Sequence, residues 1–274
     1  MILALGPYVG DFENEILIFR PYMKWVARVI KSKMVYISTH FNRAFLYDWI
    51  PEENILPVYK EFSRNEMLQI KYIHENISSN DYTLLLRQFK SDIQTIHPSE
   101  KVESYHLSYS KSGKVYYSMY KRDFSRVKLQ EDSIEEKDYI AYIPDSRFGL
   151  DEVEQVYDLL IQRYNVLVIG DMRTHLTKKN VVLQNTDYIE NGYKYIIEYI
   201  NKANAVICPL GHWAALTNLQ GTPLFTWGPY PGSYKEEGTY SFGNHQCVAI
   251  PATEETSSQK IVDSFSYFYD KIER

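Results

Sequence analysis

Short apolar runs alternate along the chain with longer stretches in which apolar residues recur every three or four positions. In the first part of the chain, the short runs that predict strands cover residues 2–5, 34–39, 55–59 and 82–86. The helical spacing between them predicts helices over 13–31 and near 64–78. Strands that alternate with helices form βαβ units, so this part predicts an α/β fold with a mainly parallel sheet.

The regular alternation weakens between residues 88 and 128. Residues 101–107 and 114–120 are predicted to be strands joined by a Ser-Lys-Ser-Gly turn. The polar run Gln-Glu-Asp-Ser-Ile-Glu-Glu-Lys-Asp then interrupts the pattern at 130–138. We therefore predict a domain boundary there, with an N-terminal domain over 1–132 and a second domain over 138–254.

The second half repeats the alternation and predicts another doubly wound unit. Its predicted strands cover 139–144, 165–170, 181–185, 205–210, 223–228 and 247–251. Its predicted helices lie at about 150–163, 190–203 and 212–220. In the last segment, 255–274, apolar residues recur at helical intervals at Ile261, Phe265, Phe268 and Ile272. This segment is predicted to be an amphipathic helix that docks near the domain boundary.

Composition and charge exclude several classes of protein. The 274 residues are 45% hydrophobic and carry a formal charge of −5, which argues against affinity based mainly on neutralising nucleic-acid phosphates. The two cysteines, Cys208 and Cys247, exclude a disulfide framework and a cysteine-rich zinc site. The start of the chain lacks a basic region, and nowhere are there 18 consecutive apolar residues. We expect a cytoplasmic protein with no transmembrane segment.

Two domains of this kind are expected to face each other across a cleft. In parallel sheets, ligands bind outside the carboxyl ends of the strands, where helix N-termini point. The sequence holds neither a Walker motif nor a Gly-x-Gly-x-x-Gly fingerprint. The site residues are therefore expected in other strand-to-helix loops.

One such loop joins the predicted strand at 205–210 to the predicted helix at 212–220. Gly211 lies between them and is followed by His212 and Trp213. A helix N-terminus carries positive partial charge, and a glycine lets the backbone approach a phosphate closely. The turn is thus a candidate diphosphate cradle. In the alternative, Gly211 only permits a tight turn while His212 and Trp213 fill the surface.

The same region resembles the glycosyltransferases of the GT-B fold, most closely the heptosyltransferase-like group of glycosyltransferase family 9. The block Gly-Thr-Pro-Leu-Phe-Thr-Trp-Gly at 221–228 and the small-residue helix before it match that family. The Asp-Ser-Gly turn of the family falls on Leu210, Gly211 and His212, and its histidine falls on Ala215. The acidic residue and the histidine of the family are therefore absent here.

A second match lies near the N-terminus, where the family has a strand, a Gly-Asp loop and a helix with an early proline. Gly10, Asp11 and Pro21 correspond to these features. The resemblance implies that Asp11 is the base that deprotonates the acceptor hydroxyl, with Gly10, Glu13 and His40 on the acceptor side. As alternatives, Asp11 caps the first helix, and Glu13 or Glu15 is the base.

Two further loops correspond to donor-binding loops of the family. Ser146 and Arg147, after the strand at 139–144, would reach the donor diphosphate, with Arg147 neutralising the leaving group. In the alternative, Arg147 is a surface residue paired with a nearby aspartate. Gly170 and Asp171, after the strand at 165–170, would lie near the nucleotide unless they form only a solvated turn.

The resemblance implies a glycosyltransferase that moves a sugar from a nucleoside-diphosphate sugar to an acceptor hydroxyl. An Asp-x-Asp pair is absent from the sequence, so we expect metal-independent, inverting transfer with no cofactor beyond the donor. A glycan, a lipid-linked glycan and a modified nucleic acid are all open as acceptors. The basic stretch 111–128 is either a solvated strand or linker or a surface that binds an acceptor bearing phosphate.

Two other functions use the same fold. A GT-B sugar-nucleotide epimerase or hydrolase would act on the donor without any acceptor. A catalytically silent protein would bind a nucleotide or nucleotide sugar, and the missing acidic residue at Leu210 is consistent with that role. Turnover of a bound donor separates an enzyme from a binding protein.

Overall fold

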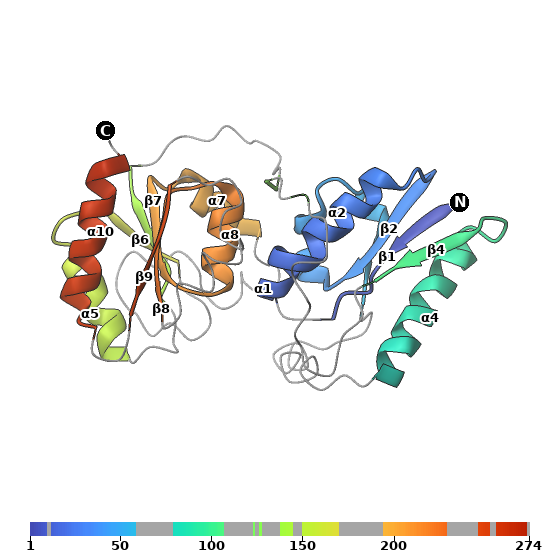
Figure 1. Cartoon of the computed structure of the whole chain (residues 1–274), viewed down its shortest axis with the longest axis horizontal. Helices are drawn as coiled ribbons and strands as arrows, with labels where there is room; N and C mark the ends of the chain where they lie inside the picture. The colour runs from blue at the N-terminus through green and yellow to red at the C-terminus, as the bar shows by residue number, and fades with distance from the viewer. Residues whose placement is uncertain are drawn as a thin grey trace. The chain divides into compact units, whose positions relative to one another are not determined.

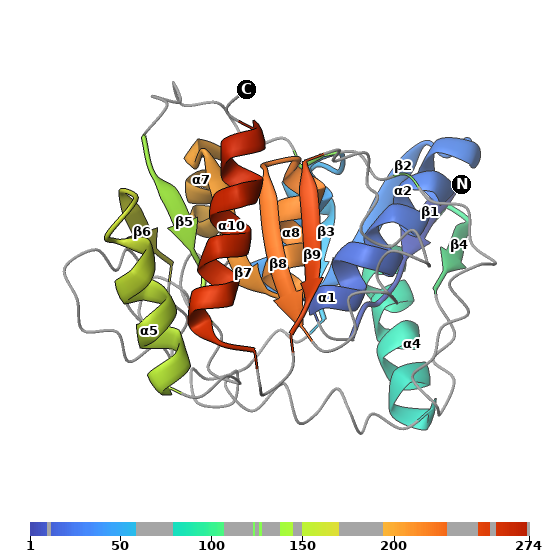
Figure 2. The ribbon, with the colours of Figure 1, turned by 60° about the vertical axis from the view of Figure 1, so that its left-hand side comes forward.

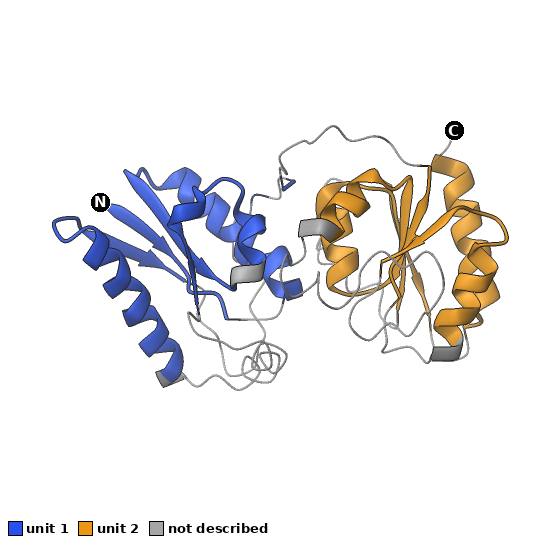
Figure 3. Ribbon diagram, turned by 180° about the vertical axis from the view of Figure 1, so that it is seen from behind, with its two compact units in different colours: residues 1–128 blue, residues 129–274 orange. Residues whose placement is uncertain are grey.

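The chain divides into two compact units in the computed structural model, Met1–Lys128 and Leu129–Arg274 (Figure 3). The structure describes residues 1–9, 12–58, 79–106, 123, 126–127, 138–144, 150–169, 194–228, 246–252 and 256–272. Residues 133–137, which separate the two predicted domains, lie outside these ranges. The exact domain limits therefore stay a prediction.

The described strands of the first unit form a parallel sheet in the order β3-β2-β1-β4 (Figure 1). They are β1 (Ile2–Leu5), β2 (Met34–Thr39), β3 (Ile55–Pro57) and β4 (Val102–Tyr105). Leu5 is in register with Ile37 of β2 and with Tyr105 of β4. Because these positions are level, the chain leaves β1, β2 and β4 at the same edge of the sheet.

The helical segments of this unit agree with the prediction in part. They are α1 (Phe12–Asn14), the π-helix η1 (Glu15–Phe19), α2 (Arg20–Val29), the 3₁₀ helices η2 (Phe41–Tyr47) and η3 (Glu52–Asn54), and α4 (Ser79–Ile96). The predicted helix at 13–31 is thus confirmed as a continuous run of three helical segments. The predicted helix near 64–78 and the predicted strand at 114–120 lie outside the described residues.

The prediction of a strand at 82–86 is wrong, because these residues belong to α4. Phe89 and Ile93, one helical turn apart, pack against Ile2 and Ala4 on one face of the sheet. The run of leucines does not enter the core as a strand would, and Leu84 stays 60% exposed. A short apolar run cannot by itself distinguish a strand from part of a longer helix.

The described strands of the second unit also form a parallel sheet, in the order β6-β5-β7-β8-β9 (Figure 2). They are β5 (Ile140–Tyr142), β6 (Val166–Val168), β7 (Ala205–Pro209), β8 (Leu224–Gly228) and β9 (Cys247–Pro251). The helices are α5 (Leu150–Leu160), α7 (Lys194–Lys202), α8 (His212–Gln220) and α10 (Ser258–Ile272). Two parallel α/β units confirm the predicted fold class, and the predicted strand at 181–185 lies outside the described residues.

The C-terminal helix α10 shares one face of the second sheet with α5, and α7 and α8 lie on the other face (Figure 1). Phe265 is fully buried, and its ring packs within 5.8 Å of the Phe225 ring and 5.6 Å of the Tyr164 ring, measured between centroids. The last segment is therefore an amphipathic helix, as predicted, and its apolar face packs into the core of the second unit. Its docking near the domain boundary stays a prediction.

In the first unit, Glu100, Lys33 and the amino terminus form an ionic cluster at the surface. This cluster predicts a pH dependence of the stability. Glu100 accepts a hydrogen bond from Lys33 Nζ at 2.7 Å and another from the amino terminus of Met1 at 3.0 Å. The Lys33 contact first, and then the amino terminus, lower the pKa of Glu100 to about 2.

A lowered pKa means that ionised Glu100 stabilises the fold above the ordinary carboxyl pKa, and that this stabilisation is lost as the pH falls toward 2. We expect the urea midpoint of Glu100→Gln to lie below that of the natural protein at pH 6 and to equal it near pH 2. Glu52→Gln, at an exposed carboxyl on the same unit, is the control. A difference between Glu100→Gln and the natural protein that does not change with pH would contradict the assignment.

Candidate functional site

Three loops begin beside one another at the carboxyl edge of the second sheet. Tyr142 of β5 is in register with Val168 of β6 and with Ile207 of β7. Beyond the strand ends, the Ile143 N–H donates to the Ile207 carbonyl at 3.0 Å and the Ile169 N–H donates to the Tyr142 carbonyl at 2.9 Å. The chain therefore leaves β5, β6 and β7 side by side.

Two of these loops carry predicted donor contacts. Ser146 and Arg147 follow β5, and Gly170 and Asp171 follow β6, but all four lie outside the described residues. The strand order starts the loop after β5 next to the β7–α8 turn and the loop after β6 one strand farther away. Their contacts with a donor stay a prediction.

The β7–α8 turn depends on the backbone of Gly211. This residue has φ 153° and ψ −163°, a region that is essentially restricted to glycine. It is the N-cap of α8, makes no side-chain cap, and its carbonyl accepts the first helical hydrogen bond from the Ala215 N–H at 3.0 Å. A glycine N-cap has no side chain to satisfy the first N–H groups of the helix, so this positive helix end is a candidate anion site.

The residue before this glycine holds the turn against the neighbouring strand. The Leu210 N–H donates to the Trp227 carbonyl at 2.8 Å. A Cβ at Gly228 would lie 2.6 Å from the end of the Leu210 side chain, so the two residues pack closely at that strand end. Leu210 therefore serves packing at the position where the resembling family has its acidic residue.

The helix that follows is unusually enclosed. Every α8 residue after His212 is buried, including Thr217, Asn218 and Gln220. His212 is half-buried, and its ring lies 4.6 Å from the ring of buried Trp213. Of the predicted phosphate-binding residues in this turn, Gly211 and His212 thus stand at the start of the helix, and Trp213 is buried in its first turn.

The carboxyl edge of the first sheet holds the loop between β1 and α1. Gly6 has φ 96°, and a Cβ there would lie 2.9 Å from the Ser38 carbonyl oxygen. The Tyr8 N–H donates to the same carbonyl at 2.8 Å, and the Tyr82 hydroxyl donates to the Pro7 carbonyl at 3.0 Å. The loop is therefore held from both β2 and α4 just before it reaches Gly10.

The predicted acceptor-side residues follow this loop. Gly10 and Asp11 lie outside the described residues, and Phe12 begins α1 directly after them. Glu13 is half-buried. His40, which directly follows β2, is 5% exposed and is the N-cap of η2. The roles of these residues stay predictions.

The alternative base Glu15 is completely buried. Its Oε1 accepts a hydrogen bond from the Tyr47 hydroxyl at 2.6 Å and a very short one from the Thr39 hydroxyl. Its Oε2 accepts from the Arg43 guanidinium at 2.9 Å. Burial raises the pKa of Glu15, while Arg43 and the hydroxyl donors act in the opposite direction. A carboxylate with both oxygens engaged inside the core is not available to an acceptor hydroxyl.

Comparisons with known proteins agree on the architecture. Neither a family model nor a curated protein sequence matches the chain. Among solved structures, the glycosyl transferase family 9 protein from Veillonella parvula matches at TM-score 0.58 and 10% identity, covering 98% of this chain and 97% of that one. The E. coli ADP-heptose lipopolysaccharide heptosyltransferase II matches at TM-score 0.53 and 12% identity, covering 100% and 99%.

A third similar structure is the E. coli heptosyltransferase WaaC with ADP, at TM-score 0.55 and 8% identity, covering 98% of this chain and 100% of the other. These matches run over nearly the full length of each protein. The chain has the GT-B fold. At such low identity the likeness establishes the GT-B fold alone, and it confirms the structural part of the resemblance seen in the sequence.

Three residues of the GT-B first unit were not identified from the sequence: Thr39, Arg43 and Tyr47. Arg43 and Tyr47 lie in a 3₁₀ helix, in which residues four apart do not share a face, so their spacing is not a signal. Their partner Glu15 lies 28 residues from Arg43 and 32 from Tyr47 along the chain. No local pattern reveals contacts over such separations.

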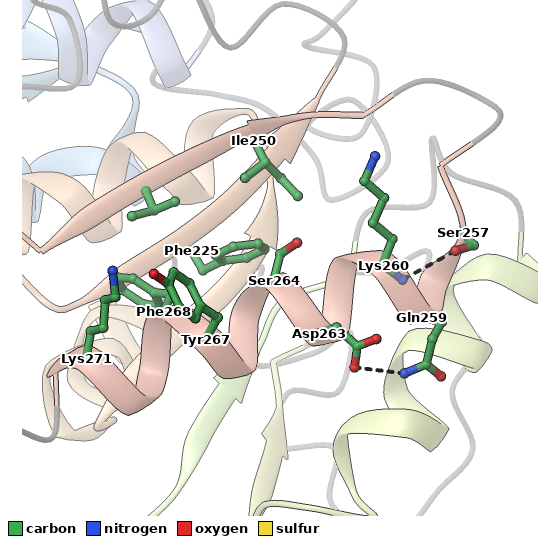
Figure 4. Close-up of a pocket in the computed structure, with 11 residues that line it drawn as sticks. Phe225, Ile250, Ser257, Gln259, Lys260, Asp263, Ser264, Tyr267, Phe268 and Lys271 are labelled. Carbon is green, nitrogen blue, oxygen red and sulfur yellow. Dashed lines mark hydrogen bonds between the residues drawn. The ribbon is translucent and has the colours of Figure 1, made fainter.

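The second GT-B unit also has a pocket of about 700 Å³ between β9 and α10 (Figure 4). Phe225, Ile250 and Phe268 form part of its wall, with Lys260 and Lys271 from the helix. Of the described residues that line it, none is a predicted site residue. The pocket lies on the α10 side of the sheet, whereas α8 covers the other side.

Within the described ranges, no group of three or more His, Cys, Asp or Glu side chains is arranged to hold a metal ion. None of the described helices is long and apolar enough to span a bilayer.

Proposed function

We propose that this GT-B protein is a glycosyltransferase that moves a sugar from a nucleoside-diphosphate sugar to an acceptor hydroxyl. The observation that carries the proposal is the β7–α8 turn. There, Gly211 adopts a glycine-only conformation and begins the nine-residue helix α8 without a capping side chain. Such a helix end attracts the diphosphate and stabilises the negative charge that develops on it as the sugar leaves.

The reaction needs a base and a means to neutralise the leaving group. In this proposal Asp11 removes the acceptor proton, and Arg147 with Ser146 assists the helix end at the diphosphate. Direct attack by the acceptor inverts the anomeric configuration. The positive groups replace a divalent cation, so EDTA is expected to leave the rate unchanged.

The similar structures support a nucleotide-sugar donor. One is an ADP-heptose heptosyltransferase and another is a heptosyltransferase with ADP. Adenosine-diphosphate sugars therefore belong in any donor screen, together with uridine, guanosine and thymidine analogues. For the acceptor, a glycan, a lipid-linked glycan and a modified nucleic acid remain the candidate classes, and we place the reaction in the cytoplasm.

A thermal-shift screen across these donors tests the proposal. A true donor at about 100 times its Kd should raise the melting temperature by roughly 5 °C. The matching nucleoside monophosphate, which lacks the second phosphate, should raise it less. A panel in which no nucleoside diphosphate or its sugar shifts the melting temperature would refute the donor site.

One observation favours a second candidate, a catalytically silent binding protein. Leu210 and Ala215 replace the acidic residue and histidine of the family's turn, and the Leu210 side chain packs against Gly228. Such a protein would be stabilised by a donor that it never consumes. An epimerase or hydrolase would instead release an epimer or free sugar without any acceptor.

A further inference from the structure

The start of the first helix carries two charges where an apolar core is expected. Residues 15–20 are all buried, and Glu15 and Arg20 are both 0% exposed. Burying a charge is unfavourable unless it is paired and hydrogen-bonded. The segment includes η1, and π-helical turns occur frequently at functional sites.

Both charges pair with the segment that follows β2: Glu15 with η2 itself, and Arg20 with η2 and the residue directly after it. Glu15 binds Arg43, as described above. Arg20 donates from Nε to the Leu46 carbonyl at 2.5 Å, and its Nη2 lies 3.3 Å from an Asp48 carboxylate oxygen. The helical run thus pairs its acid, Glu15, with Arg43, and its base, Arg20, with Asp48. Any shift of η2 along the helix would break both pairs, so the arrangement fixes one register.

The Arg43 side chain also contacts Phe12, the residue that follows the predicted acceptor loop. Its guanidinium lies 5.3 Å from the centre of the Phe12 ring, and the Phe12 ring lies 6.4 Å from the Phe45 ring. Phe12 is 5% exposed and directly follows Asp11 in the chain. Holding Phe12 against η2 restricts where the preceding residue reaches.

We infer that Glu15 is a positioning residue: by orienting Arg43 against Phe12, it fixes the start of α1 and thereby the reach of the preceding residue Asp11, the proposed base for acceptor deprotonation. This inference rests on the proposed function. It separates the two acidic residues, because Asp11 would take the proton while Glu15 would keep its charge inside the core. The Thr39 and Tyr47 hydroxyls complete the cage around the Glu15 carboxylate.

The test compares Glu15→Gln with Tyr36→Phe. Glutamine keeps the size of Glu15 but removes its charge, so kcat should fall by about 10²-fold through misplacement of the base. Donor Kd should not change, and the acidic limb of the kcat pH profile should remain. Tyr36→Phe removes one hydrogen bond, to His97 at 2.9 Å, elsewhere in the same sheet, and should leave kcat unchanged.

A second variant covers the case in which Glu15→Gln fails to fold. Arg43→Lys keeps the charge but loses the planar group over Phe12, and it should also lower kcat at constant donor Kd. Wild-type kcat in both folded variants would overturn the inference, and so would loss of the acidic limb in Glu15→Gln, which would make Glu15 the base itself.

Hydrogen exchange separates failure of the inference from failure of the proposed function. Amides of residues 8–14 should exchange about 10-fold faster in whichever of Glu15→Gln and Arg43→Lys folds, but not in Tyr36→Phe. Unchanged exchange contradicts the inference whether or not transfer is detected. Absence of transfer by the natural protein, with the exchange effect present, contradicts the proposed function and leaves the contact between Glu15, Arg43 and Phe12 confirmed.

Discussion

Asp11→Asn should lower the rate of sugar transfer by about 10²–10⁴-fold while donor affinity stays the same. Asparagine keeps the size of Asp11 and much of its hydrogen bonding, but it cannot accept the proton of the acceptor hydroxyl. The donor is bound by the other unit in this account, so its Kd should not respond. Transfer rate and donor Kd are to be measured on the same preparation.

The alternative role of Asp11 gives the opposite result. If Asp11 only caps the first helix, Asn caps about as well, and both stability and transfer should survive. The base would then be Glu13 or His40, since Glu15 is enclosed by its hydrogen-bond donors. Loss of donor binding in Asp11→Asn would instead place this residue at the donor.

Gly211→Ala should weaken binding of the nucleoside diphosphate by about 10–100-fold. At φ 153° a Cβ is strained by ~1–3 kcal/mol, which corresponds to this range if the turn leaves its binding geometry. The added methyl group would also stand between the backbone and the phosphates. Calorimetric titration with the nucleoside diphosphate measures the effect, and the urea midpoint reports the stability of the same variant.

Gly221→Ala is the matched control for this variant. Gly221 ends the same helix with φ 75°, so alanine there imposes comparable backbone strain at the opposite end of α8. It should lower stability and leave nucleotide affinity unchanged. Equal losses of nucleotide affinity in the two variants would show that binding depends on the integrity of α8 as a whole and not on its N-terminus.

The fold was largely readable from the sequence because its signals are local. The helical spacing of Ile261, Phe265 and Phe268 predicted α10, and the run Ala205–Pro209 predicted a buried strand. The prediction at 82–86 is wrong because five residues are too few to distinguish helical from strand periodicity. These residues belong to a helix whose later positions, Phe89 and Ile93, are buried against the sheet. The strand that pairs with β1 on that side is β4, and not residues 82–86.

The candidate site was readable only where a residue type is informative alone. Gly211 was identified because a glycine directly before a helix suggests a backbone conformation that other residues avoid. The φ and ψ angles of Gly211 confirm such a conformation. The partners of Glu15 were not identified, because charge pairing across 28 residues depends on how η2 folds back on the helix. Asp11, Ser146, Arg147, Gly170 and Asp171 lie outside the described residues, so their roles still rest on the resemblance.

The central claim is that the protein consumes a nucleoside-diphosphate sugar. The most direct test incubates it with the donor selected by thermal shift, and follows release of the nucleoside diphosphate by chromatography and the configuration of the sugar by NMR. The account expects steady release, accelerated by a suitable acceptor hydroxyl, with the sugar inverted at its anomeric carbon and the release strongly reduced in Asp11→Asn. A donor that binds and stabilises the protein yet stays intact, with and without acceptors, would contradict it and identify a binding protein instead.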